Sequence, residues 1–139
     1  MIDFNYEFEF ELNNENYYAD WLTRVIILHQ GFVSNVSFIF CDDSYLLEIN
    51  KQYLNHDTYT DIITFDYCNG KTISGDIFIS IERVKENALD FNVDFDTELK
   101  RVMAHGILHL LGFKDKEDMD IKIMRSKEEE TIKLFHVEH

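Results

Sequence analysis

Hydrophobic and polar positions alternate from the start of the chain. Over residues 2–12 every even position is apolar or aromatic, and the positions between them are acidic or amide side chains. This period of two is typical of a strand with one buried face. The alternation returns over residues 36–40, and two further β-rich runs flank Asn69-Gly70, a dipeptide typical of a tight turn. The sequence therefore predicts four strands, at residues 2–12, 36–40, 61–67 and 72–80.

Helical patterns occupy the intervals between and after these strands. Asn13 and Asn14 can cap the first helix, Asp42 to Ser44 the second and Thr97 the fourth, and glycines can end the first and fourth. The predicted helices cover residues 15–31, 44–53, 81–91, 97–112 and 118–135. The order β-α-β-α-β-β-α-α-α predicts an α+β fold, in which a small four-stranded mixed sheet packs with about five helices.

Length and composition fit one compact domain. The chain has 139 residues, 45% of them hydrophobic, and no proline, repeat or low-complexity linker divides it. We therefore expect one domain over residues 1–139. No apolar run approaches the ~20 residues of a membrane span, no secretory signal is visible, and Cys41 and Cys68 form no CxxC motif. These features predict a cytoplasmic protein with two reduced thiols and no membrane partner.

The charge is strongly acidic and unevenly spread. The formal net charge is −14, but residues 1–82 carry only 3 of the 13 basic residues and 14 of the 27 acidic ones. An overall field of this sign does not attract nucleic acid. Any anionic ligand should therefore meet the C-terminal half of the chain.

The candidate chemistry lies in residues 105–115, which read HGILHLLGFKD. His105 and His109 are four residues apart on a predicted helix, so their imidazoles project from one face about one turn apart. Gly112 can end the helix in the left-handed conformation, and Asp115 can then return to the same point. Two imidazoles and one carboxylate make a three-ligand zinc set with a fourth position free. The spacing mirrors the zincin signature, with aspartate as third ligand.

Two other interpretations of this segment stay open. Two histidines at this spacing on a core helix can occur by chance, although burying them would require polar partners. A peptidase is the second alternative, but the glutamate that serves metalloproteases as general base is replaced here by Gly106. A metal hydrolase that acts on an anionic electrophile such as a phosphodiester fits the pattern better.

The same residues resemble the YbeY family, the endoribonuclease rRNA maturation factors. HGILHLLGFKD is similar to the family motif H-G-x-L-H-L-x-G-Y-D-H, residues 60–65 (TDIITF) to T-D-V-L-S-F, and residues 75–80 (GDIFIS) to G-D-I-x-I-S. The resemblance spans about residues 46–125 and implies a zincin-like metal-binding helix. It also implies a zinc-dependent, single-strand-specific endoribonuclease with one zinc ion per chain, bound by His105, His109 and Asp115. Its role would be 16S rRNA 3′-end maturation and late-stage ribosome quality control, with ribosomal RNA and a ribosomal subunit or ribosome-associated protein as partners.

Two departures from the family pattern matter. The family's third histidine aligns with Asp115, a harder and anionic zinc ligand, so the site should carry one less positive charge. The family's arginine aligns with Leu54, which removes a phosphate contact. The catalytic residue proper therefore stays unknown beyond a zinc-activated water.

Basic residues around the motif are the candidates for RNA contact. Lys100, Arg101, Lys114 and Lys116 bracket the histidines in the less acidic half. The competing interpretation makes them solvated surface charges. The last helix, with Glu128–Glu130 among its charges, is predicted to be a salt-bridged surface face. Asp61 is predicted either to orient a metal ligand or water, or to serve a cap or turn.

A further alternative is a non-catalytic ribosome-binding factor in which zinc is purely structural. Leu54 and the net charge of −14 favour it. A closed fourth ligand, such as a cysteine near the metal, would distinguish it from an enzyme.

Overall fold

The structure is a computed structural model that describes residues 1–54 and 60–136. Its elements follow the predicted order, and the α+β fold with a four-stranded mixed sheet and five helices is confirmed. The elements are β1 (Ile2–Tyr6), α1 (Glu15–Leu28), β2 (Phe32–Cys41), α2 (Asp43–Leu54), β3 (Ile62–Asp66), β4 (Thr72–Ser80), α3 (Ile81–Phe91), α4 (Phe95–Leu110), α5 (Asp118–Lys133) and a 3₁₀ turn, η1 (Leu134–His136).

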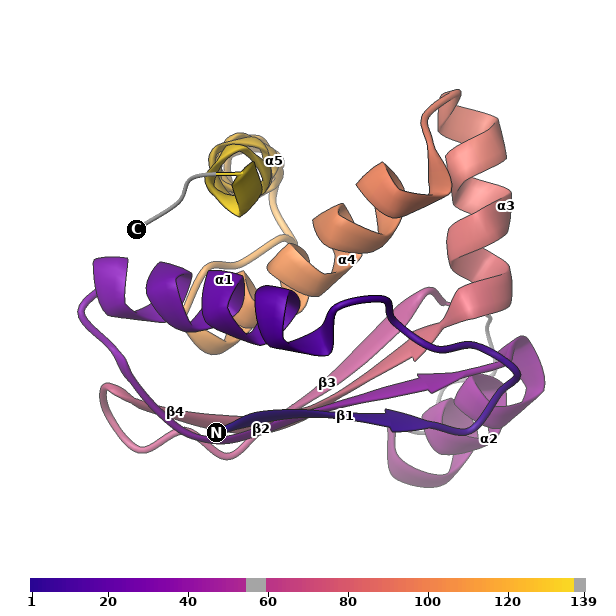
Figure 1. The fold of residues 1–139 in the computed structure, drawn as a ribbon, viewed down its shortest axis with the longest axis horizontal. Helices are drawn as coiled ribbons and strands as arrows, with labels where there is room; N and C mark the ends of the chain where they lie inside the picture. The colour runs from indigo at the N-terminus through magenta and orange to yellow at the C-terminus, as the bar shows by residue number, and fades with distance from the viewer. Residues whose placement is uncertain (55–59, 137–139) are drawn as a thin grey trace.

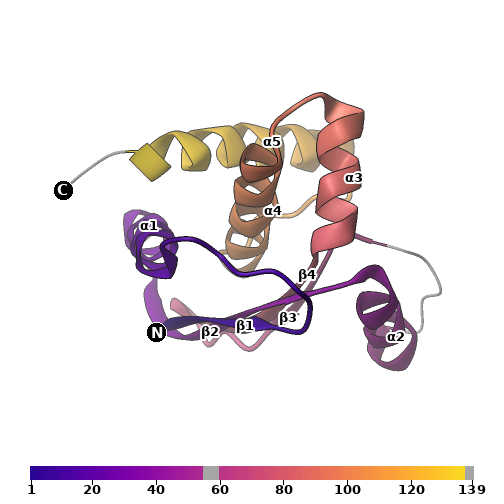
Figure 2. The same cartoon turned by 45° about the vertical axis from the view of Figure 1, so that its right-hand side comes forward.

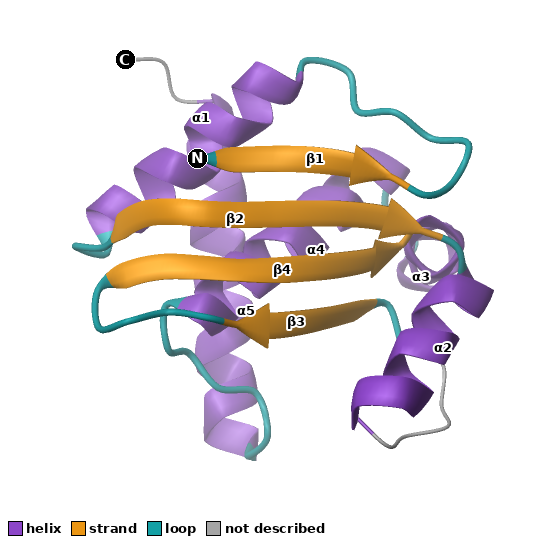
Figure 3. Cartoon of the chain, turned by 90° about the horizontal axis from the view of Figure 1, so that it is seen from below, coloured by secondary structure: helices purple, strands orange, loops and turns teal. Residues whose placement is uncertain are grey.

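The strands lie in the order β1-β2-β4-β3 (Figure 3). β2 pairs in parallel with β1 and with β4, whereas β3 and β4 form an antiparallel hairpin. The predicted turn at Asn69-Gly70 joins them, and Gly70 has a φ of 60°, in the left-handed region that favours glycine. β3 is consequently an edge strand, and its first residues lie beside the helix that carries the histidines.

Helices α1 and α4 lie on one face of the sheet, and α5 crosses α4 on the side away from the strands (Figures 1 and 2). The main core fills the space between this face and the helices, with Trp21, Phe38, Ile77, Met103 and Ile107 fully buried. Helix α2 lies on the opposite face (Figure 3), where Cys41, Leu46 and Ile63 form a smaller core. Burial of apolar surface in these two layers is the main favourable term in folding.

Several predicted boundaries were wrong; β2, for example, begins at Phe32 and not at residue 36. β1 ends at Tyr6 and not at residue 12, because its neighbour β2 ends just beyond the residue that pairs with Tyr6, and no strand remains to continue the ladder. α1 ends three residues before Gly31, and Gln30 takes the left-handed conformation with a φ of 66°. α4 begins at Phe95 with Asp94 as its N-cap residue, two residues before the predicted Thr97 cap.

The prediction of one domain over residues 1–139 includes residues 55–59 and 137–139, which lie outside the described part of the chain. The described residues share the sheet and the two cores on its faces. Within the same residues, no helix is both long and apolar enough to cross a bilayer.

Candidate active site

Helix α4 supplies the central residues of the site. Its apolar positions Leu99, Val102, Met103, Ile107 and Leu110 recur at helical spacing and face the sheet and its neighbours. The two histidines lie at the edge of this buried stripe, where His105 is partly exposed and His109 is exposed. The helix therefore fixes the backbone positions of both histidines while leaving their imidazoles accessible.

A tight turn ends α4 and brings the chain back toward His105. Gly112 has a φ of 103°, which side-chain-bearing residues rarely adopt, and its N–H donates to the carbonyl of His109. The Phe113 N–H donates to the carbonyl of Leu108, which completes a Schellman-type C-terminus. After this turn, Asp115 Oδ2 lies 3.2 Å from His105 Nε2. The predicted return of the carboxylate to the histidine face is present.

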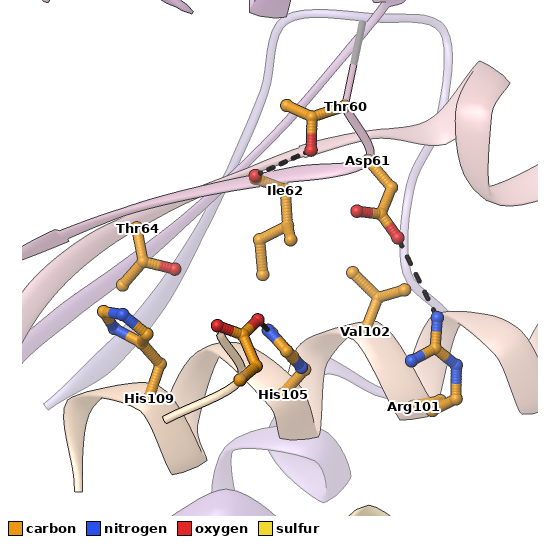
Figure 4. A pocket seen from close by; sticks show the side chains of 9 residues that line it. Thr60, Asp61, Ile62, Thr64, Arg101, Val102, His105 and His109 are labelled. Carbon is orange, nitrogen blue, oxygen red and sulfur yellow. Dashed lines mark hydrogen bonds and ion pairs between the residues drawn. The ribbon is translucent and has the colours of Figure 1, made fainter. Parts of the chain in front are cut away.

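Residues of α4, β3 and the loop after α4 enclose a pocket of about 310 Å³ (Figure 4). Figure 4 shows the rings of His105 and His109 rising from the helix toward β3, with Thr64 opposite His109. The residues that line the pocket are Thr60, Asp61, Ile62, Thr64, Arg101, Val102, His105, His109 and Asp115. All three predicted zinc ligands therefore lie in one cavity.

Gly106 explains why the helix approaches the sheet so closely. A Cβ atom at this position would lie 3.0 Å from two side-chain atoms of Ile77 and 3.1 Å from Ile62 Cδ1. Residue 106 thus points into the core and not into the pocket. A glutamate here could not occupy the position of a metalloprotease general base without displacing the sheet.

A buried ionic network supports the back of the pocket. His105 Nδ1 lies 2.7 Å from Glu128 Oε2, and the other oxygen of Glu128 accepts from Arg101 Nη1 at 3.2 Å. Arg101 also donates from Nε and Nη2 to the two oxygens of Glu98, at 2.9 and 2.6 Å. Glu98 and Glu128 are only 1% and 2% exposed. Burial of these charges is tolerated because each is hydrogen-bonded.

The network shifts the acidity of its members. Burial lowers the pKa of His105, but the hydrogen bond and charge of Glu128, together with the charges of Asp115 and Asp61, outweigh this effect and raise the pKa above its ordinary value. Burial raises the pKa of Glu128, but His105 and Arg101 together bring it below its ordinary value. Both shifts favour the charged forms of the pair.

Asp61, at the start of β3, behaves differently. Burial raises the pKa of its carboxyl group, and the opposing charge of Arg101, whose Nη2 lies 3.8 Å from Asp61 Oδ2, only partly offsets this effect. Asn87 Nδ2 donates to the same oxygen at 3.4 Å. Asp61 also lines the pocket.

No ready-made metal-binding group of three His, Cys, Asp or Glu side chains is present among residues 1–54 and 60–136. His105 and Asp115 face each other, whereas the ring of His109 is directed at Thr64 (Figure 4). His109 and Asp115 are both exposed, so that rotation about their side-chain bonds is not restricted by core packing.

The four basic candidates for RNA contact lie in different environments. Lys114 and Lys116 are exposed on the loop beside Asp115. The Lys100 Nζ lies 4.1 Å from the centre of the Phe135 ring, on the α1 side of α4 and away from the pocket. The Arg101 side chain lines the pocket but is only 18% exposed and is bonded to carboxylates.

The predicted role of Glu128 as a surface charge was wrong. Lys127 and Glu130 do form an exposed pair at 3.1 Å, as expected for this helix. Glu128, however, shares the buried face of α5 with Met124 and Thr131. This i, i+4, i+7 spacing is the sequence signal that could have identified it. Thr64 was also missed as a lining residue, because an alternating strand gives no indication of which inward side chain borders a cavity.

The fold and the pocket together define a class of small α+β domain, in which a histidine-bearing helix packs against a mixed sheet and faces a pocket rich in carboxylates. Comparison with known proteins identifies the family. The model of the family described as Endoribonuclease YbeY matches residues 5–136. A Flavobacterium johnsoniae protein named Endoribonuclease YbeY is 61% identical over 138 residues, which cover 99% of both chains.

Other relatives agree with this match. A Christiangramia forsetii protein of the same name is 56% identical over 137 residues, covering 99% of this chain and 96% of that protein. The solution structure of TM1509 from Thermotoga maritima superposes with a TM-score of 0.68 at 29% identity, covering 97% of this chain and 89% of that one. The chain belongs to the endoribonuclease YbeY family. The predicted class of enzyme, a hydrolase that cleaves RNA phosphodiester bonds, is thereby confirmed.

Proposed function

We propose that this protein is a zinc-dependent endoribonuclease that cleaves single-stranded RNA in the cytoplasm. Its proposed role is 16S rRNA 3′-end maturation and late-stage ribosome quality control, as the sequence resemblance implies. The observation that carries the proposal is the separation of 3.2 Å between His105 Nε2 and Asp115 Oδ2, in a pocket that His109 also lines.

The residue types of the donor set, and the separation of His105 from Asp115, fit zinc. With bonds of about 2.0–2.2 Å, two ligand atoms of a tetrahedral zinc ion lie roughly 3.3 Å apart, close to the separation of these two atoms. Two imidazoles and one carboxylate leave a fourth position for water or substrate. When bound there, zinc would lower the pKa of a coordinated water and offset the negative charge that develops on a phosphodiester.

The charges behind the pocket also support a cation. Glu98 and Glu128 place two nearly inaccessible negative charges against one guanidinium, that of Arg101. Asp61 and Asp115 add two further carboxyl groups at the pocket wall. An additional positive charge at His105 would reduce this imbalance, whether it comes from a proton or from a metal ion.

The proposed way of holding RNA relies on a partner. The net charge of −14 repels a polyanion at long range. Arg101 is bonded internally and Lys100 lies on another side of α4, so Lys114 and Lys116 are the exposed candidates beside Asp115. We therefore infer that a ribosomal subunit or a ribosome-associated protein positions the RNA. Cleavage of naked RNA should be slow and strongly salt-dependent.

The two alternative functions are less well supported. A peptidase of the metalloprotease type needs a carboxylate at residue 106, but this position points into the core, where a Cβ atom would already lie 3.0 Å from Ile77. A purely structural zinc site needs a closed fourth ligand. Cys41 and Cys68 are both described, and neither lines the pocket; their thiols contact backbone carbonyls.

The test combines metal analysis with RNA cleavage. Purified protein should contain one zinc ion per chain, and His105→Ala or His109→Ala should each abolish stoichiometric binding. His29→Phe is the control, because it removes an imidazole outside the pocket but keeps the ring that packs edge-on against Phe113. The zinc-loaded protein should cleave ribosomal particles faster than naked rRNA. Full zinc content in both pocket variants, or equal cleavage by loaded and metal-free protein, would contradict the proposal.

A further inference from the structure

Glu128 is a carboxylate that the proposed chemistry does not use. It lies on the buried face of α5, the helix that crosses α4 (Figure 2), and is 2% exposed. A buried carboxylate is costly unless its oxygens are paired. One oxygen of Glu128 lies 2.7 Å from His105 Nδ1 and the other accepts from Arg101 at 3.2 Å. The side chain is therefore bonded at both oxygens.

This arrangement determines where the proton of His105 resides. An ionised carboxylate only accepts hydrogen bonds, so Nδ1 of His105 must carry the hydrogen. A neutral imidazole with a proton on Nδ1 has a bare Nε2. That nitrogen lines the pocket, and a bare ring nitrogen is what a metal ion requires. Asp115 Oδ2, 3.2 Å from Nε2, competes for the ring hydrogen, but the Asp115 side chain is 43% exposed, whereas that of Glu128 is 3% exposed and lies 2.7 Å from Nδ1. The shorter contact in the drier environment favours the hydrogen on Nδ1.

Arg101 in turn holds Glu128 in place. Its Nε and Nη2 bind Glu98 as a fork, which fixes the plane of the guanidinium and leaves Nη1 directed at Glu128. Arg101 has no acceptor atoms, so Glu128 must present an oxygen to it. Glu98, Arg101 and Glu128 thus form a chain of hydrogen bonds that ends at His105.

We propose that Glu128 is a positioning residue that, held by Arg101, fixes the tautomer and ring orientation of His105 for zinc. The proposal rests on the proposed function, in which His105 Nε2 binds the metal. It also assigns Arg101 to this support and not to RNA contact. Carboxylate partners of metal-binding histidines typically contribute 10–100-fold to metal affinity.

The first experiment needs no variant and no metal. Nitrogen NMR of the metal-free wild-type protein, at a pH where the ring is neutral, should show His105 as the Nδ1–H tautomer. The opposite result, a proton on Nε2, would overturn the proposal even if the protein binds zinc.

The second experiment uses Glu128→Gln, with Glu129→Gln as control. Glu129 is the exposed neighbour on the same helix, so the control removes the same charge away from the pocket. In Glu128→Gln the amide oxygen must face Arg101, which turns the NH₂ group toward His105 Nδ1 and forces the ring proton onto Nε2. We expect this tautomer switch together with a zinc affinity about 10–100-fold weaker in a chelator-competition assay, and neither change in Glu129→Gln.

The outcomes separate the two proposals. If wild-type protein binds no zinc, the proposed function fails, while the tautomer measurement still decides the role of Glu128. If wild type binds zinc and Glu128→Gln binds it equally well with an unchanged tautomer, only the positioning role is wrong. If Glu128→Gln does not fold, the wild-type tautomer alone supports or overturns the proposal.

Discussion

The indole nitrogen of Trp21 donates a hydrogen bond of 2.8 Å to the backbone carbonyl of Thr131, and so joins α1 to the last turns of α5. Trp21 is fully buried, and α5 carries Glu128 to the back of the pocket. One side chain from the first helix therefore holds the helix that supports His105.

Trp21→Phe should destabilise the protein. The substitution removes the indole donor from the Thr131 carbonyl, which keeps the Leu134 N–H, and shrinks a core ring. Together these changes should cost about 2–4 kcal/mol. Urea unfolding of the metal-free protein measures the loss. Tyr53→Phe, which alters a ring that is 68% exposed, should change the free energy of unfolding by less than about 0.5 kcal/mol. Equal stabilities of the two variants would contradict the structural role of the indole.

Gly106→Ala should also destabilise the protein, despite alanine's better helix propensity. The added Cβ meets Ile77 at 3.0 Å, and overpacking of this kind costs about 1–3 kcal/mol against a propensity gain of about 1 kcal/mol. Ile77→Val removes one of the two contacting atoms. In a double-mutant cycle it should recover part of the loss, whereas additive effects would show that the contact is not responsible.

Asp61→Asn should change how stability depends on pH. A carboxyl group whose pKa is raised by folding holds its proton more tightly in the folded state. Its contribution therefore favours the fold at low pH and is lost as the pH rises from the ordinary value of about 3.9 through the raised pKa. Relative to wild type, the Asn variant should gain stability across this window and keep a constant difference above it.

The measurement is urea unfolding at a series of pH values with a chelator present. Asp90→Asn alters an exposed carboxylate on α3 and serves as the control. A difference between wild type and Asp61→Asn that does not vary with pH would mean that the Asp61 pKa is not raised.

Asp115 is predicted to contribute its charge to the metal site. Asp115→Asn keeps the shape but removes the anionic ligand, so zinc should bind more weakly. Asp115→His supplies an imidazole and should restore the affinity, giving the ligand set of the family motif. Chelator competition measures both variants, with Asp118→Asn on the nearby surface as the control. Wild-type affinity in Asp115→Asn would place the third ligand elsewhere.

Leu54→Arg should increase the cleavage of naked RNA. Leu54 is the last residue of α2 and is 42% exposed, so an arginine there costs little stability and offers a bidentate contact to phosphate. The rates on naked and ribosomal RNA should then converge. Lys51→Arg, one turn earlier on the same helix, controls for a general effect of the guanidinium. Equal wild-type rates on both substrates, with no gain from Leu54→Arg, would remove the case for a recruiting partner.

The parts of the structure that depend on local pattern were predictable from the sequence. The alternating strands, the helix around His105 and His109, and the turn at Gly112 each follow from residues within a few positions of one another. The end of β1 was not predictable in this way, because the alternation continues to Leu12 while the pairing strand β2 stops at Cys41. The extent of a strand is set by its neighbour and not by its own sequence.

The site residues also divide into those that a local motif predicts and those that only tertiary packing brings together. The histidines and Asp115 share one motif and were found together, whereas Glu128 was misread because its neighbours in sequence are all charged. Its partner His105 lies on another helix. Periodicity identifies the buried face of α5, but it does not indicate that a carboxylate on that face meets a histidine. Such pairs arise from tertiary packing, which a single sequence does not encode in any local signal.

The crossing of α5 over α4 has a consequence for the order of events during synthesis. The sheet and both histidines emerge from the ribosome before α5, so a nascent chain lacks the carboxylate partner of His105 until nearly all the described residues have been made. The hydrogen bond from the Trp21 indole to the Thr131 carbonyl likewise cannot form until α5 has been synthesised. Under the proposed role of Glu128, a prematurely terminated fragment that ends before α5 would carry His105 and His109 without the carboxylate that aligns the His105 ring.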